Sequence, residues 1–272
     1  GAYSAIHLTR AGIPFELALI GAGLVSAVIG LGFGAAALRV KGLYLAVSTL
    51  AMQYLVDWII SHTPAISGGS QATLQAPSFA VLGIAIDSDA RRYWVALVLC
   101  ILVASFMLNV RRTSFGRALA AVRDKDFAAA IIGVNAFYVK LVAFWTSSFI
   151  GGVAGAVLAF CYYGAVTPEQ FHLDVSVQAV AMVIVGGMGS VIGSFFGAGL
   201  VLLAPIVLNN LVGGAAELLS LPLSPEVISH IPLILYGGLI VGFLLFEPLG
   251  LAKIYDNART YFLVWPFRHA RR

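Results

Sequence analysis

The chain has 272 residues, of which 60% are hydrophobic and only 10% are charged. Because a soluble domain carries about 25% charged residues, this composition excludes an ordinary soluble domain, and the apolar runs are too long and uniform for an outer-membrane barrel. The net charge of +4 does not indicate nucleic-acid binding, since the basic residues lie at the ends of apolar runs, where they set membrane topology. We therefore expect an all-α, polytopic helical membrane protein without a nucleic-acid partner.

Apolar runs suited to membrane helices recur along the chain, since about 20 apolar residues in a helix match the hydrocarbon thickness of a bilayer. In chain order these runs are Leu17–Leu38, Leu43–Ile60, Tyr93–Val110, Tyr138–Tyr163, Val175–Leu211 and Ile231–Phe246. Within the loop Ser61–Arg92, the segment Phe79–Ile86 is apolar but too short to span, so we expect it to lie at the interface or to re-enter. The sequence thus predicts about six to seven membrane segments.

The distribution of Lys and Arg orients these segments, because cytoplasmic loops carry an excess of both. The basic regions are the loop with Arg39 and Lys41, the segment from Arg111 to Lys125, and the tail from Lys253 onward. We predict that all three are cytoplasmic. The loops at residues 164–174 and 212–230 contain acids but no Lys or Arg, so we predict that they are external.

The run Val175–Leu211 must cross the membrane twice in this scheme, because a single crossing would leave the basic tail outside. Residues 186–190 (GGMGS) supply a bend, since glycine tolerates the backbone conformations of a sharp turn. We expect a short or re-entrant limb, then a glycine-rich break, then a full helix from about Val191. Irregular backbone at membrane depth is tolerated where it is buried in protein or lines a cavity. The break therefore supplies candidates for a translocation path, with a tight turn at the membrane surface as the alternative: Gly186, Gly187, Gly189 and Ser190.

Glycines recur at four-residue spacing in several runs, which lets helix backbones approach closely in lipid. These sets are Gly30 with Gly34, Gly151 with Gly155, and Gly189 with Gly193 and Gly197. They predict that the apolar segments pack against protein, either from this chain or from another.

One compact charged segment, Arg111–Asn135, separates two of the long apolar runs. Leu119, Val122, Ala130 and Ile131 fall at helical spacing in it, opposite the charged residues 123–126. We expect one short amphipathic helix that is capped by Ser114 and ended by Gly133 in the left-handed conformation. It is either a solvated linker or a docking helix whose Ala-rich surface fits a cytosolic partner. The candidate docking residues are Arg117, Arg123, Asp124, Asp126, Ala128, Ala129 and Gly133.

The charged segment also carries a resemblance to a known family. Gly116–Asp124 (GRALAAVRD), followed by Ala128-Ala129 and Gly133-Val134-Asn135, resembles the coupling segment of Liv-type permeases, the membrane subunits of branched-chain amino-acid ABC importers. Further similar motifs, in chain order, are Arg39–Ala46 (RVKGLYLA), Ser67–Ser70 (SGGS), Gly151–Ala156 (GGVAGA), Thr167–Phe171 (TPEQF) and Gly186–Ser190 (GGMGS). The family's DGL after the SGGS-like loop is replaced by residues 71–73 (QAT), while the long loop and the basic tail are more similar to the LivM type.

The resemblance implies a complex in which this chain is one permease. The expected partners are a second homologous permease subunit, two cytosolic ATPases that bind ATP and Mg, and a periplasmic substrate-binding protein. The expected location is the bacterial inner (plasma) membrane, as a multi-pass protein surrounded by lipid bilayer. The chain itself is expected to hold no catalytic residue, cofactor or metal, and no Lys in it follows a Gly, as a GxxxxGK[ST] phosphate-binding loop requires.

The resemblance also predicts how the chain is organised. Residues 1–250 form a single transmembrane permease domain that contains the coupling helix, residues 111–135, and residues 251–272 form a basic cytoplasmic tail. Gly1-Ala2-Tyr3 is similar to the end of the family's FFGIGAY, so we expect N-terminal spans that this sequence does not contain.

Polar side chains within the apolar runs are further candidates for the path, because a polar group at membrane depth usually faces protein or water. They are Ser48, Thr49, Gln53 and Gln178. Hydrogen bonding between helices is at least as good an interpretation. The implied function is import of branched-chain or related amino acids, with urea, amides or other small solutes as alternatives. A secondary transporter is a remote alternative, for which Asp57 would be the proton-coupling acid.

Overall fold

The structure is a computed structural model, and it describes residues 1–38, 43–69, 73–218, 237–238, 241–242, 250–253, 257 and 260–261. The chain divides into two compact units, Gly1–Leu173 and Asp174–Arg272. Each unit is described by itself below. The loop with Arg39 and Lys41, most of the last expected apolar run and most of the basic tail lie outside the described residues.

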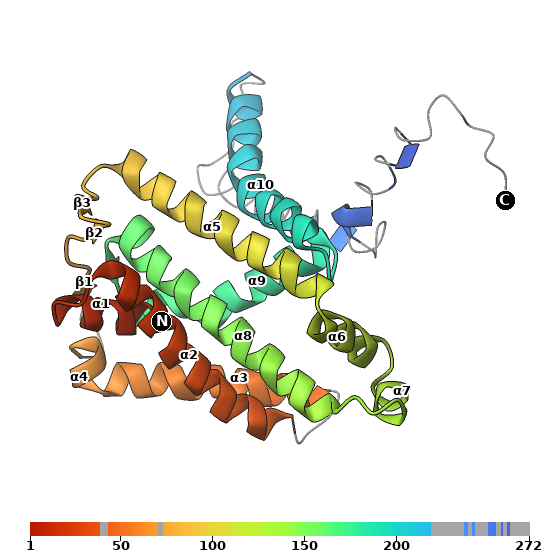
Figure 1. The fold of residues 1–272 in the computed structure, drawn as a ribbon. Helices are drawn as coiled ribbons and strands as arrows, with labels where there is room; N and C mark the ends of the chain where they lie inside the picture. Colours follow the sequence, from red (N-terminus) through yellow and green to blue (C-terminus); the bar gives the residue numbers. More distant parts are fainter. Residues whose placement is uncertain are drawn as a thin grey trace. The chain divides into compact units, whose positions relative to one another are not determined.

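The first unit is built mainly from helices, as Figure 1 shows. Its helices are α1 (Ala2–Arg10), α2 (Phe15–Ala37), α3 (Leu43–His62), α4 (Pro64–Ser67), α5 (Asp89–Arg112), α6 (Ser114–Asp124), α7 (Asp126–Ile131), α8 (Ala136–Val157), the π-helix η1 (Leu158–Tyr163) and the 3-10 helix η2 (Pro168–Phe171). Its strands are β1 (Leu74–Gln75), β2 (Ala80–Val81), β3 (Ile84–Ala85) and β4 (Ala165–Val166). The all-α prediction is confirmed, because the strands are only two residues long.

Four helices within the described residues are long and apolar enough to cross a membrane: Phe15–Ala37, Asp89–Arg112, Ala136–Tyr163 and Val191–Leu211. Helix α3 has 20 residues and covers the second expected run, but it is not among these four. Helix α5 stands out, because none of its most apolar window is buried within the protein. An apolar helix with that exposure suits contact with lipid or with another subunit.

Helices α2 and α8 pack closely because glycines on both lie at their interface. A Cβ added at Gly23 would lie 2.7 Å from the Phe149 ring, and one at Gly34 would lie 3.0 Å from the Phe144 ring. A Cβ at Gly152 would run into Ser26 of α2. Small residues permit such close backbone approach between apolar helices.

The predicted glycine spacings are confirmed only in part. Gly30 and Gly34 do pack against α8, and the N–H of Ala2 lies close to Gly155. Gly151, however, has nothing within 4 Å of an added Cβ, because its neighbour Gly152 occupies the face of α8 that meets α2. Within this chain it is Gly152, and not the regularly spaced Gly151, that packs against α2, and packing of Gly151 against another chain stays a prediction.

The loop between α3 and α5 pairs with the start of the expected external loop 164–174 at one end of the first unit. Strand β1 runs antiparallel to β4, with Leu74 opposite Val166. The loop between α3 and α5 and the loop after α8 therefore lie on the same side of the first unit. Figure 1 shows β1–β3 at one end of this unit and α6 with α7 at the other.

The apolar segment Phe79–Ile86 forms a hairpin of β2 and β3, and whether it lies at the interface or re-enters the membrane stays a prediction. The tip residue Leu82 has a φ of 50°, and its N–H donates to the Glu16 carboxylate of α2 at 2.5 Å. Phe79 and Ile86, at the base of the hairpin, are buried. The hairpin is thus fixed to the helices at both its tip and its base.

Three aromatic rings join this hairpin to α2 and to η1. The ring centroids of Phe15 and Phe79 are 4.6 Å apart, and those of Phe160 lie 5.2 Å from Phe15 and 5.3 Å from Phe79. Aromatic pairs at such distances contribute about 0.5–1.5 kcal/mol beyond their buried area. This cluster holds the external end of the first unit together.

The second unit contains a helical hairpin, α9 (Leu173–Gly186) followed by α10 (Val191–Leu218). Gly186 packs against Gly193, and Gly197 packs against Met182, so the two helices run antiparallel from the turn between them. The 14 residues of α9 extend about 21 Å at about 1.5 Å per residue, less than the hydrocarbon core of about 30 Å. The predicted short limb, break and helix from Val191 are confirmed.

Candidate functional site

The charged segment that follows α5 forms two helices rather than the one that the sequence predicts. Helix α6 ends at Asp124, Lys125 has an extended backbone (φ −151°, ψ 95°), and α7 begins at Asp126. The expected cap is also one residue out, because the Thr113 side chain, not that of Ser114, accepts the Gly116 N–H at 3.2 Å. We call this region the α6–α7 segment.

The break at Lys125 changes which residues of the segment are buried. Val122 of α6 and Ala129 of α7 are buried against Val139 of α8, and Leu119 packs around them. Ala130 and Ile131, which helical spacing placed on the buried face, are exposed. The prediction failed for α7 because a single continuous helix was assumed, and the interruption rotates α7 relative to α6.

Gly133 ends α7 in the left-handed conformation, as predicted, with a φ of 89°. The Val134 N–H donates to the Ala129 carbonyl at 3.0 Å, and the Gly133 N–H donates to the Ala130 carbonyl at 3.1 Å. This pair of hydrogen bonds is the Schellman arrangement, in which glycine supplies the left-handed residue. Asn135 then accepts the Tyr138 N–H through its side chain and starts α8. The segment is therefore tied firmly to α8.

The charged side chains of the α6–α7 segment mostly interact locally. Arg117 donates to the Arg112 carbonyl at 3.3 Å, and Arg123 pairs with Asp124 at 3.0 Å. Asp126 pairs through Oδ2 with Lys140 of α8 at 2.5 Å, while its Oδ1 is buried without a hydrogen-bond partner. Arg117, Arg123 and Asp124 remain exposed to solvent and are available to a partner protein.

Large apolar side chains project from α7 beside these charges. Phe127 is 81% exposed, Ile131 71% and Ile132 74%, and Ala128 is also exposed. Sequence reasoning selected the small and charged residues here and missed these three. The sequence did contain a signal, which is the number of large apolar residues in this short stretch. A helix as short as α7 can bury only one face, so some of them must be exposed. An exposed apolar cluster rimmed by charges is typical of a protein-interaction surface.

The polar candidates in α3 lie in the first unit. Ser48, Thr49 and Gln53 are half-buried, and the Gln53 amide donates to the Phe171 carbonyl of η2 at 3.5 Å. Asp57, further along the same helix, is 3.9 Å from His172 Nδ1. Gln53 therefore makes a hydrogen bond between two helices, which the sequence left open as the alternative to a place in the translocation path.

The remaining path candidates lie in the second unit. Gly187 and Gly189 have φ values of 108° and 86°, so both need the conformational freedom of glycine. Ser190 Oγ accepts the Gly193 N–H at 3.0 Å and caps α10. Gly186 and Gly187 are buried, Met188 is exposed, and Gln178 is half-buried in α9. The glycine-rich break between α9 and α10 is therefore present in the backbone, whereas its part in a translocation path stays a prediction.

Within the residues that the structure describes, no group of three or more His, Cys, Asp or Glu side chains is placed to hold a metal ion.

The long apolar helices define a class of protein, the polytopic helical membrane proteins. The comparison with known families is more specific. The profile of the family described as "Branched-chain amino acid transport system / permease component" matches residues 1–244, and the chain belongs to this family. It is a family of transport permeases and not of enzymes.

Curated relatives agree with this membership. The chain is 31% identical over 214 residues to the high-affinity branched-chain amino acid transport system permease protein LivM of Salmonella typhimurium, a match that covers 70% of this chain and 50% of the relative. It is 24% identical over 238 residues to a probable LivM of Methanocaldococcus jannaschii, covering 86% and 67%. The chain thus spans about half the length of the first of these relatives. No solved structure matches it.

Proposed function

We propose that this chain is a transmembrane permease subunit of an ABC importer, and that it forms part of the path for branched-chain or related amino acids across the bacterial inner membrane. Membership of the family and the similarity to LivM permeases support this function. ATP and Mg would bind to partner ATPases, and a second permease and a periplasmic binding protein would complete the complex.

The observation that carries the proposal is the exposed face of the α6–α7 segment. Phe127, Ile131 and Ile132 are large, apolar and unburied at the basic end of the first unit, outside any apolar span. Leaving such side chains in water costs about 25 cal/mol for each Å² of apolar surface. A cytosolic ATPase that covers them would recover this free energy.

The connections of the segment suit it to transmit movement. Helix α5 ends at Arg112 and α6 begins at Ser114, while α7 is fixed to the start of α8 by the Gly133 turn and the Asp126–Lys140 pair. A displacement of the segment therefore acts on both α5 and α8. ATP would shift the permease between outward-open and inward-open states only through its different affinity for the two states of the complex.

The test is uptake by the purified complex in proteoliposomes, with labelled leucine, urea and acetamide as substrates. Gly133→Val places a β-branched residue at a φ of 89° and should abolish leucine uptake while ATP hydrolysis continues, because the link from α7 to α8 is distorted. Gly133→Asn is the matched control, since asparagine tolerates this conformation, and should retain most uptake. Reversal of Arg117 and Arg123 to Glu should also uncouple hydrolysis from transport.

Two results would contradict the proposal. Uptake of leucine in wild type without added ATP would favour a secondary transporter, and Asp57 would become the residue to replace. Normal ATP-driven uptake in both Gly133→Val and the double arginine variant would remove the coupling role of the α6–α7 segment. Uptake of urea or acetamide alone would retain the importer and change its substrate.

A further inference from the structure

A cavity of about 220 Å³ lies at the external end of the first unit, between the β2–β3 hairpin, α5 and η1. Its apolar walls include Phe79, Ile86 and Phe160, and Ser78 contributes a hydroxyl. A cavity of this volume suits a small solute and not a peptide.

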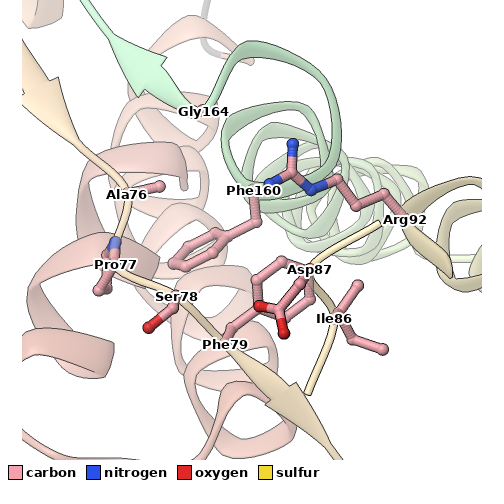
Figure 2. A pocket seen from close by; sticks show the side chains of 9 residues that line it. All are labelled: Ala76, Pro77, Ser78, Phe79, Ile86, Asp87, Arg92, Phe160 and Gly164. Carbon is pink, nitrogen blue, oxygen red and sulfur yellow. The ribbon is translucent and has the colours of Figure 1, made fainter. Parts of the chain in front are cut away.

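Two opposite charges line the same cavity, Asp87 from the loop and Arg92 from the first turns of α5. Figure 2 shows both side chains among those that line the cavity. Among the described residues, no hydrogen bond or ion pair is recorded for the Asp87 side chain, and Asp87 is exposed. Its carboxylate oxygens therefore remain available to a ligand.

The guanidinium of Arg92 is also poorly satisfied by the protein. Its Nη1 is 3.5 Å from Asp89, whose side chain is 98% exposed, and such an exposed pair contributes little. Its Nε is buried and makes no hydrogen bond. An arginine with a purely structural role normally uses its planar set of hydrogen-bond donors. Arg92 therefore has unused donors, and 35% of its side chain is accessible.

The cavity is also on the side from which an imported solute arrives. It lies at the N-terminal end of α5, whereas the α6–α7 segment follows the C-terminal end of the same helix. The 24 residues of α5 extend about 36 Å, enough to separate the two faces of a bilayer. The basic end is cytoplasmic by the distribution of Lys and Arg, so the cavity opens externally.

From this geometry we propose that the cavity around Asp87 and Arg92 is an external binding site for a zwitterionic α-amino acid with an apolar side chain. The carboxylate of Asp87 receives the ammonium group, the Arg92 guanidinium and Ser78 hydroxyl receive the carboxylate, and Phe79, Phe160 and Ile86 contact the side chain. Charge-assisted hydrogen bonds of this kind are the stronger ones. The role of this site as the first contact of an imported solute with the permease rests on the proposed function, whereas its ligand chemistry does not.

The first test needs no variant. Binding of tritiated L-leucine to the purified wild-type complex, without ATP or binding protein, is measured in competition with leucinol, which lacks the carboxylate, and with 4-methylpentanoate, which lacks the ammonium group. Unlabelled leucine should compete at least about tenfold better than either analogue, because each analogue leaves either Asp87 or Arg92 without its partner. Equal competition by either analogue, or no leucine binding, would overturn the proposal.

The second test assigns the binding to this cavity. Arg92→Gln and Asp87→Asn should each weaken leucine binding by about tenfold or more, as expected when a charged hydrogen-bond partner is lost. Arg91→Gln and Glu169→Gln are matched controls, since they remove the same charges from exposed positions outside the cavity. Equal affinity in the cavity variants and the controls would overturn the proposal.

Uptake measured in parallel separates this inference from the proposed function. Leucine uptake that is intact in all four variants, with no change in leucine binding, would reject the site and retain the importer. Leucine binding that depends on Arg92 and Asp87 in a complex that imports nothing would retain the site and reject the function.

Discussion

The helix pair α2–α8 and the α6–α7 segment are both rich in Gly and Ala, but the small residues have opposite surroundings in the two regions. At the α2–α8 interface, Gly23, Gly34 and Gly152 face side chains or backbone of the opposite helix, with no room for a Cβ. In α7, Ala128 and Ala130 are exposed, and the large residues Phe127 and Ile131 are exposed with them. Small residues therefore indicate close packing, but they do not indicate whether the partner is in the same chain.

The strongest test of this comparison replaces one of two adjacent glycines in α8. Gly152→Leu should destabilise the protein by about 3 kcal/mol or more, because overpacking an interface with no free space forces the helices apart. Gly151→Leu should have little effect, since nothing lies within 4 Å of an added Cβ there. Thermal unfolding in detergent, followed by fluorescence-detected size exclusion, measures both. Equal loss in the two variants would show that the bulk of the added side chain, and not the α2–α8 contact, sets the result.

A smaller effect is expected from the exposed face of α7. Phe127→Glu should leave thermal stability unchanged, because the side chain is 81% exposed, but should weaken binding of the partner ATPase by at least about tenfold. Aromatic residues that anchor an interface commonly contribute about 2 kcal/mol or more. Phe127→Leu keeps an apolar side chain and should restore most of the binding. The affinity between purified permease in nanodiscs and purified ATPase is the measurement, and wild-type affinity of Phe127→Glu would contradict the assignment.

The smallest effect concerns the ion pair that links α7 to α8. Lys140→Gln should lower stability by about 0.5 kcal/mol, since both partners are partly exposed and such pairs contribute about 0.2–1 kcal/mol. The loss should shrink in high salt, which screens the pair. Lys125→Gln, an exposed neighbour that is outside this pair, is the control. A double-mutant cycle with Asp126→Asn gives the coupling energy, and a value above about 2 kcal/mol would mean that the pair is effectively buried.

The features that the sequence predicted correctly are those in which one residue type forces one conformation. Gly133, Gly187 and Gly189 occupy positive φ values that other residues rarely adopt, so the chain had to end or turn a helix there. The start of α10 at Val191 follows from the Ser190 cap. The four long apolar helices follow from composition alone.

The features that the sequence did not predict depend on packing between distant segments. Residues 123–126 are all compatible with a helix, so nothing local indicates the break at Lys125. Gly151 and Gly152 differ only in which face of α8 they occupy. The sequence placed Arg92 only at the end of a loop. Its place in a cavity depends on Phe160, which is 68 positions later in the numbering (160 − 92). The β1–β4 pairing brings that later segment to the loop.

The antiparallel course of α9 and α10 has an electrostatic consequence. The carbonyl end of α9 and the N–H end of α10 meet at the turn, and these ends carry partial charges of about −0.5 and +0.5. Side by side, the two poles largely cancel, and Gly187 and Ser194 satisfy backbone carbonyls of Val183 and Ser190 by hydrogen bonds of 3.0 and 3.1 Å. The turn therefore needs no Asp or Lys as a counter-charge, which is how Val175–Ala216 can fold without a single charged side chain. Neutrality in this part of the chain follows from helix direction as well as from hydrophobicity.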